Sequence, residues 1–249
     1  MQQDPVSDHV SRERWLKAQE WEKEHWVLAQ RMRARYFKNV AWRLLTTAGL
    51  VSKYRGDDWN AWWRRQFDDY KFLPAEVENA IEAGCGPYTN VRLMLEKCRI
   101  HHLILSDPLI RTYVHFNLTF VAEMYRKAAC ILDDHTLEAL PFASDYFDLT
   151  VMINVLDHVE DARRCMENIT RIVRRGGLLI LGQDLTNEED LEALKGAPGT
   201  VGHPINLNHE WFDPFLIGFQ PVLKKVLTRN EGRDSHHHYG TLIFAGRKA

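Results

Sequence analysis

The stretch that most constrains this chain runs from Glu78 to Gly86 and reads ENAIEAGCG. Apolar residues around Ile81 predict a buried strand, and the sequence Gly84-Cys85-Gly86-Pro87 ends it abruptly. Because glycine has no Cβ, such a turn lets a ligand approach the backbone. Residues 90–97 can form a helix. Strand, turn and helix together predict the nucleotide-binding corner of a Rossmann-like sheet.

The glycine spacing argues against a dinucleotide. The fingerprint of NAD and FAD sites requires a third glycine three residues after the second, but Thr89 occupies that position. Pro87 also removes a backbone N–H from the turn that would hold a pyrophosphate. An NAD-dependent oxidoreductase is therefore disfavoured, whereas a nucleotide without a diphosphate remains compatible with the turn.

An acidic residue ends the next predicted strand, 102–106. This residue is Asp107, and an acid at the tip of the second strand can accept hydrogen bonds from both ribose hydroxyls. The alternative is an ordinary surface turn, because Asp-Pro is a common turn start. The spacing after the glycine turn favours the ribose interpretation.

Four blocks in this order resemble the class I S-adenosylmethionine (SAM) methyltransferases, and most closely the broad type 11-like group that methylates small molecules. The blocks are EAGCGP, SDP, ALPF with FDLTVMINVLDHVED, and RIVRRGGLLILGQDL. The resemblance covers about residues 78–248. It implies SAM as cofactor and S-adenosylhomocysteine as product. The cofactor site that we expect consists of Glu82, Ala83, Gly84, Cys85, Gly86, Asp107, Pro108, Leu109, Leu137, Glu138, Asn154, Val155 and His158.

The chain departs from the family pattern where the adenine would bind. Many family members carry an acid shortly before the LPF motif, and that acid meets the adenine amino group. Here the position falls near residues 136–138, and Asp133 and Asp134 lie slightly earlier. The adenine contact stays open, with backbone groups around Leu137 as one possibility.

Strands and helices alternate after the glycine turn, which predicts an α/β fold with a parallel sheet and helices on both faces. Further strands are expected at 129–132, 147–153, 178–183, 222–228 and 241–245, and helices at 111–128, 161–173 and 208–218. The last two strands have no helix between them and should form an antiparallel hairpin. The family resemblance adds the strand order 3-2-1-4-5-7-6 of a doubly wound, seven-stranded sheet whose last strand is antiparallel.

Residues 1–75 predict an aromatic-rich helical cap on a SAM-binding methyltransferase domain formed by residues 76–249. A helix is expected from Ser7 to about Leu50, followed by an aromatic cluster at 59–72. Seven of the eight tryptophans precede residue 64. These aromatic side chains either pack on the core or form a lid that closes over the acceptor and excludes water.

Two histidines are the predicted catalytic residues. Methyl transfer from a sulfonium ion is an in-line displacement that depends mainly on alignment, but a hydroxyl acceptor also needs a base. His203 is the preferred base, because it precedes the helix beside the acceptor pocket and Pro204 restricts its backbone; the alternative is a turn residue. His158, in LDHVED, is interpreted first as cofactor packing. His209 and His236–His238 are expected at the same end of the sheet, where the strands have their carboxyl ends. Consecutive residues of an extended loop point in different directions, so the run of three histidines is not expected to bind one metal ion.

Composition excludes several other classes. The net charge of −2 gives no electrostatic footprint for nucleic acid. The four cysteines are scattered without a CxxC pair, which predicts neither a zinc site nor disulfides and fits a reducing cytoplasm. The first residues lack the apolar run of a signal peptide, and no segment approaches the roughly 20 apolar residues of a membrane span. We expect a cytoplasmic protein with no membrane partner and leave its oligomeric state open.

These observations favour a SAM-dependent methyltransferase of EC 2.1.1 type that acts on a small polar acceptor. Oxygen of a sugar or similar metabolite is the preferred target, because tryptophan stacks well on ring faces. The alternative is a non-catalytic SAM-binding partner or regulatory protein. The intact glycine turn, Asp107 and the histidine-rich rim argue against that alternative.

Overall fold

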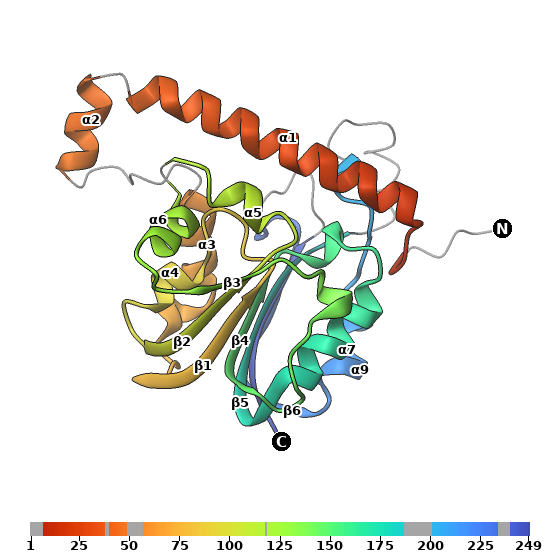
Figure 1. The fold of residues 1–249 in the computed structure, drawn as a ribbon. Helices are drawn as coiled ribbons and strands as arrows, with labels where there is room; N and C mark the ends of the chain where they lie inside the picture. Colours follow the sequence, from red (N-terminus) through yellow and green to blue (C-terminus); the bar gives the residue numbers. More distant parts are fainter. Residues whose placement is uncertain (1–6, 38–39, 49–56, 118, 187–200, 234–239) are drawn as a thin grey trace.

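The computed structural model describes residues 7–37, 40–48, 57–117, 119–186, 201–233 and 240–249, and the statements below concern these residues. A seven-stranded sheet in the order β3-β2-β1-β4-β5-β7-β6 forms the centre of the fold (Figure 1). The predicted Rossmann-like fold and strand order are thus confirmed. The strands are β1 (Glu76–Ala83), β2 (Arg99–Ser106), β3 (Ile131–Asp133), β4 (Phe147–Ile153), β5 (Val173–Leu185), β6 (Phe219–Leu227) and β7 (Gly240–Lys248).

Strand order reverses direction at β1. This strand pairs in parallel with β2 on one side and with β4 on the other. In open α/β sheets a crevice forms outside the carboxyl ends of the strands at such a switch point. The glycine turn follows β1 directly, so the topology places it in that crevice.

The far edge of the sheet is antiparallel, as predicted. β7 pairs antiparallel with both β5 and β6. β5 begins five residues before the predicted segment, and a register shift separates its first pairing, Phe147↔Val173, from the next, Leu149↔Leu178. The extra residues 174–176 are exposed, which explains why hydrophobicity alone did not identify them.

Helices pack on both faces of the sheet because its strands alternate their side chains between two hydrophobic clusters. Ile81 and Met152 belong to the cluster beneath α7 (Ala162–Ile172), whereas Ala80 and Val151 belong to the cluster on the opposite face. The second cluster is covered by α3 (Asp57–Gln66), α4 (Val91–Met94), α5 (Ile110–Tyr113) and α6 (Phe120–Arg126).

Several predicted helices are shorter than expected. The predicted helix 111–128 is divided into α5 and α6, because Thr119 adopts an extended backbone and caps α6 by accepting a hydrogen bond from the Ala122 amide at 3.3 Å. The predicted helix 208–218 is a 3₁₀ turn, Glu210–Phe212, followed by α9 (Asp213–Leu216). The predicted helical piece within 187–200 lies outside the described residues.

The amino-terminal helices lie at the ligand-binding end of the sheet. α1 (Arg12–Phe37) crosses the carboxyl edge of the strands, and α2 (Val40–Thr47) continues beyond it (Figure 1). Two helices therefore replace the single helix predicted from Ser7 to about Leu50. No helix in the described ranges has both the length and the apolar character needed to cross a membrane.

The aromatic residues before the sheet divide between two locations. Trp63 and Phe67 are buried in the cluster under α3, as packing on the core would require. Trp15 and Trp26 instead project from α1 into a cavity at the carboxyl edge. The division into a cap of residues 1–75 and a domain of residues 76–249 stays a prediction.

Phe147 offers a test of the core. This residue is fully buried and makes edge contacts with the rings of Phe142 and Tyr146. Phe147→Ala should lower the free energy of unfolding by about 3–5 kcal/mol, because it leaves a cavity in a packed interior. Ile217→Ala is the control, since Ile217 is 89% exposed, and it should change stability by less than about 0.5 kcal/mol. Urea denaturation measures both, and equal stabilities would contradict the packing described here.

Candidate active site

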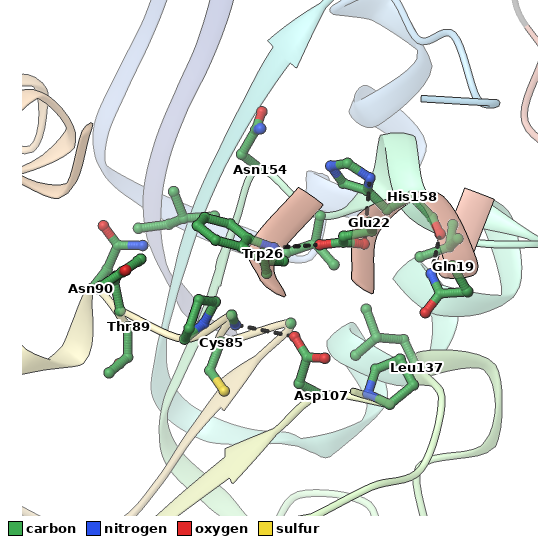
Figure 2. A pocket seen from close by; sticks show the side chains of 18 of the residues that line it. Gln19, Glu22, Trp26, Cys85, Thr89, Asn90, Asp107, Leu137, Asn154 and His158 are labelled. Atoms are coloured by element: carbon green, nitrogen blue, oxygen red, sulfur yellow. Dashed lines mark hydrogen bonds and ion pairs between the residues drawn. The ribbon is translucent and has the colours of Figure 1, made fainter. Parts of the chain in front are cut away.

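A cavity of about 190 Å³ opens at the carboxyl ends of β1, β2 and β4 (Figure 2). Its walls come from the glycine turn, the loop after β2, the 3₁₀ turn Leu137–Ala139 and the loop after β4, and α1 forms its roof. Most of the predicted cofactor residues line it: Gly84, Cys85, Gly86, Asp107, Pro108, Leu137, Glu138, Asn154, Val155 and His158. Glu82, Ala83 and Leu109 are not among the residues that line it.

Gly84 fits its position because it has no side chain. Its φ of +67° is unfavourable for other residues, and an added Cβ would lie 2.4 Å from Val155 Cγ1. The turn after β1 is therefore pressed against the turn after β4. Gly86 also has a positive φ, +54°, but an added Cβ there would meet no atom within 4 Å.

Glu82 holds the turn from behind. Its carboxylate accepts hydrogen bonds from the backbone amides of Asn90 at 2.7 Å and Val91 at 3.0 Å, and from the Thr89 hydroxyl. Burial raises the pKa of Glu82, although these hydrogen bonds oppose the shift. Thr89, which breaks the dinucleotide pattern, thus ties the turn to the buried acid.

Asp107 presents its carboxylate at the end of β2. Oδ2 accepts from the Gly86 amide at 3.0 Å and Oδ1 from the Leu109 amide at 2.8 Å. A carboxylate has about four acceptor sites, so each oxygen keeps capacity for a ligand hydroxyl. Burial, together with the nearby charge of Glu22, raises the pKa of Asp107 to about 7.

Gln183 fixes the loop after β4. Its Oε1 accepts from the backbone amides of Val155 at 3.2 Å and Leu156 at 3.0 Å, and its Nε2 donates to Asp157 Oδ1 at 3.1 Å. One buried amide therefore holds both the wall of the cavity and the carboxylate behind it. Gln183 is the last residue of the strand predicted at 178–183, but the sequence did not indicate this function.

The two predicted catalytic histidines lie together, 4.5 Å apart between ring centroids, but only His158 lines the cavity. His203 stands behind it, where its Nδ1 is 2.6 Å from Asp157 Oδ2. Burial would raise the pKa of Asp157, but the two histidines and Gln183 outweigh it and hold this pKa well below its usual range. The preference for His203 as the base stays a prediction; the geometry favours His158.

Asp157, His158 and His203 carry the ligand types of a transition-metal site. Metal–ligand distances of about 2.1 Å in tetrahedral geometry separate two ligand atoms by about 3.4 Å. The 2.6 Å between Asp157 and His203 is instead a hydrogen-bond distance. The arrangement therefore suits a proton held between the two groups.

His158 is held by hydrogen bonding and surrounded by negative charge. Its Nδ1 donates to the backbone oxygen of Gly202 at 2.9 Å, because a carbonyl can only accept. Glu22 Oε2 and Asp157 Oδ2 each lie 3.7 Å from a ring nitrogen. Burial opposes protonation of the ring, but these two carboxylates, together with the Gly202 carbonyl and Asp107, outweigh it and raise the pKa of His158.

The sequence suggested a lid over the site but not which side chains of α1 form the roof of the cavity. Trp15, Gln19, Glu22 and Trp26 all line it from α1, and Figure 2 shows the last three. Their spacing of four, three and four residues is that of one helix face. This periodicity was visible in the sequence, but only the docking of α1 across the sheet edge shows what the face covers.

Other polar residues at the carboxyl edge of the sheet either have a charged partner or lie outside the described residues. Arg233 lines the cavity and forms an ion pair with the buried Asp184 at 2.5 Å. His209 lies beside Glu210 at 3.4 Å. The histidine run 236–238 lies outside the described residues.

Comparison with known proteins places these features in context. Residues 81–181 match the family model described as a methyltransferase domain. Uncharacterized methyltransferases of Mycolicibacterium vanbaalenii and Mycolicibacterium gilvum are each 31% identical to this chain over 107 residues. That alignment covers 43% of this chain and 35% of each relative, so the match spans about a third of their length.

Solved structures share the fold. The YcgJ protein of Bacillus subtilis matches with a TM-score of 0.58 and 13% identity, over 76% of this chain and 98% of its own. The N-methyltransferase NodS of Bradyrhizobium japonicum WM9, in complex with S-adenosyl-L-homocysteine, matches with a TM-score of 0.52 and 16% identity, over 88% and 97%.

The contrast between Gly84 and Gly86 gives a matched test of the turn. Gly86→Ala should cost about 1–2 kcal/mol of stability, because an L-residue must adopt the left-handed conformation. Gly84→Ala should cost clearly more, since its Cβ also displaces Val155. Chemical denaturation of the two variants measures the difference, and equal costs would show that the two turns are not in contact.

Proposed function

We propose that this chain is a class I SAM-dependent methyltransferase that transfers the methyl group of SAM to a small polar acceptor. A hydroxyl oxygen of a sugar or a similar metabolite is the preferred target. The observation that carries the proposal is the meeting of the Gly84 turn, which has no room for a side chain, with the buried Asp107 carboxylate in one cavity.

The residues present fit the cofactor. Asp107 keeps acceptor capacity for ribose hydroxyls beside the open space at Gly86. At the glycine-turn end, Asn90 Oδ1 is a buried acceptor without a hydrogen-bond partner in the described part of the chain. It would accept from the ammonium group of the methionine part. The cofactor supplies an activated methyl group on a positively charged sulfur, so the chain mainly has to align and enclose the reactants.

α1 supports enclosure. Its tryptophans Trp15 and Trp26 cover the cavity with apolar rings, and α1 is fastened to the body by the Arg12–Glu160 ion pair at 2.7 Å. The cavity volume of about 190 Å³ is below the roughly 300–1,000 Å³ of typical ligand pockets. We therefore expect α1 to move outward when cofactor and acceptor enter, which is the behaviour of the predicted cap.

His158 is the proton acceptor that the geometry favours for a hydroxyl substrate. Its Nδ1–H is held by Gly202, which leaves Nε2 as the basic nitrogen. Asp157 Oδ2 lies 3.7 Å from Nε2 and stabilises the charge that forms when the ring takes a proton. His203, hydrogen-bonded to the same carboxylate, orients Asp157 in this scheme.

Asp107→Ala should weaken SAM binding at least tenfold, because hydrogen bonds to a charged group contribute about 1.5–3 kcal/mol each. Isothermal calorimetry measures the affinity. Asp134→Ala is the control: Asp134 pairs with Arg111 on the surface at 2.9 Å and should leave the affinity unchanged. A wild-type affinity for Asp107→Ala would remove this residue from the site.

The acceptor proposal is tested by incubation of the wild-type protein with SAM and cell extract. Release of S-adenosylhomocysteine, with a methyl gain found by mass spectrometry, supports a methyltransferase. Amine acceptors belong in the screen beside hydroxyl compounds, because one neighbour of the same fold is named an N-methyltransferase. SAM binding without any turnover would instead support the alternative, a non-catalytic SAM-binding protein.

The rate should depend on pH through His158. The protonated ring cannot act as a base, so the single-turnover rate at saturating SAM should rise with pH, with a midpoint above the ordinary histidine value of about 6.5. Glu22→Gln removes one of the three carboxylates that raise this pKa, the others being Asp157 and Asp107. That variant should shift the midpoint to lower pH. An unchanged midpoint would show that another group accepts the proton.

A further inference from the structure

Gln19 brings an amide group from α1 into the cavity, where the residue is only 9% exposed. Its Nε2 donates to the backbone oxygen of His158 at 3.2 Å. Because a carbonyl oxygen only accepts, this hydrogen bond determines which end of the amide faces His158. Oε1 therefore faces away from that carbonyl, and it is buried without a hydrogen-bond partner among the described residues.

A buried acceptor without a partner is uncommon and unfavourable in a folded protein. An apolar side chain at position 19 would not leave a buried oxygen unpaired. The position of Gln19 suggests a donor on a ligand. An unpaired buried oxygen on a residue that lines a cavity is suited to accept from an N–H group that arrives with the ligand.

One end of the cavity is suited to a nucleobase. With a ribose on Asp107, a base would extend over Pro108 toward Leu137, which lies on the far side of Asp107 from Cys85 in the glycine turn (Figure 2). Figure 2 shows Gln19 reaching from α1 to the backbone of His158, on the side of the cavity where Leu137 lies. Trp26, farther along α1, covers the opposite end near Cys85 and Asn90 (Figure 2).

The acidic side chains at the nucleobase end each have hydrogen-bond partners within the protein. Glu138 Oε1 accepts from the backbone amides of Glu160 at 2.9 Å and Asp161 at 3.2 Å. The two oxygens of Asp133 meet the Ser106 hydroxyl at 2.7 Å and His135 Nδ1 at 2.6 Å.

Asp134, the third acid near this end, is turned to the surface, where it pairs with Arg111. The acid expected before the LPF motif thus has other partners in this chain, while Gln19 Oε1 has none that the structure describes.

We propose that Gln19 Oε1 accepts a hydrogen bond from the exocyclic amino group of the adenine, so that α1 selects the base of the cofactor. The inference rests on the proposed function, because it requires an adenine nucleoside in this cavity. It assigns the amino group to a side chain some 120 residues before the position where the family pattern places an acid.

The test compares two ligands that differ at this group. S-Adenosylhomocysteine carries the amino group, whereas S-inosylhomocysteine carries a carbonyl oxygen in its place and would face Gln19 Oε1 with a second acceptor. Calorimetry on the wild-type protein should show at least about tenfold tighter binding of the adenosyl compound, the size expected when a buried acceptor loses its donor. In Gln19→Met, which keeps the length but removes the acceptor, the ratio should fall to within about threefold.

Gln30→Met is the matched control. Gln30 is a second glutamine on α1, and its Nε2 donates to the Tyr88 hydroxyl at 2.7 Å. This variant should keep the wild-type ratio, and thermal melting with the ligands present establishes that both variants are folded.

The outcomes separate the two proposals. A wild-type ratio near one, or a Gln19→Met variant that keeps the full ratio, overturns the role of Gln19 and leaves the cofactor site intact. If the wild-type protein binds neither compound, the proposed function itself fails.

Discussion

The close approach of Gly84 to Val155 is the contact on which the site depends. It brings the turn after β1 against the turn after β4, and a Cβ on Gly84 would lie 2.4 Å from the valine side chain. On one side of this contact Glu82 ties the glycine turn to the start of α4. On the other side Gln183 ties the β4 loop to β5. The cavity exists because two loops from different strands are held this close without side chains filling the space between them.

Negative charge surrounds the cavity. Glu22 stands in the roof, Asp107 in one wall, and Asp157 behind His158. Burial makes unbalanced charges unfavourable, and the raised pKa values of Asp107 and His158 are two responses to that cost. A ligand that carries a positive sulfur and an ammonium group would balance these carboxylates, which is the electrostatic counterpart of the geometric fit.

α1 also contacts the segment that orients His158. Besides Glu22, it supplies Trp21, whose ring fills the space next to Gly202, where an added Cβ would lie 2.3 Å from the indole. The Gly202 oxygen in turn holds His158 Nδ1. The position of α1 and the orientation of the histidine are therefore coupled through one short segment, so a movement of α1 would reach the proposed base as well as the roof.

The sequence by itself determined the sheet and most of the cavity wall. Strand runs, the glycine turn and Asp107 are local patterns, because a buried parallel strand is apolar throughout and a strand-to-turn junction needs glycine where the backbone is left-handed. The family resemblance added the strand order, which the structure has. Helix ends were predicted less well, since α5 and α6 are separated by a local cap at Thr119 that hydrophobic periodicity does not reveal.

Only the tertiary structure decided which side chains lie over the cavity and which distant ionisable residues interact. Gln19, Glu22 and Trp26 are separated from Gly84 by about 60 residues of chain, so no local pattern could place them in its neighbourhood. The same holds for Asp157 and His203, which are 46 residues apart and joined by one hydrogen bond. Periodicity identifies the faces of a helix, but long-range packing selects the surface that each face meets, and for α1 that surface is the open end of the sheet.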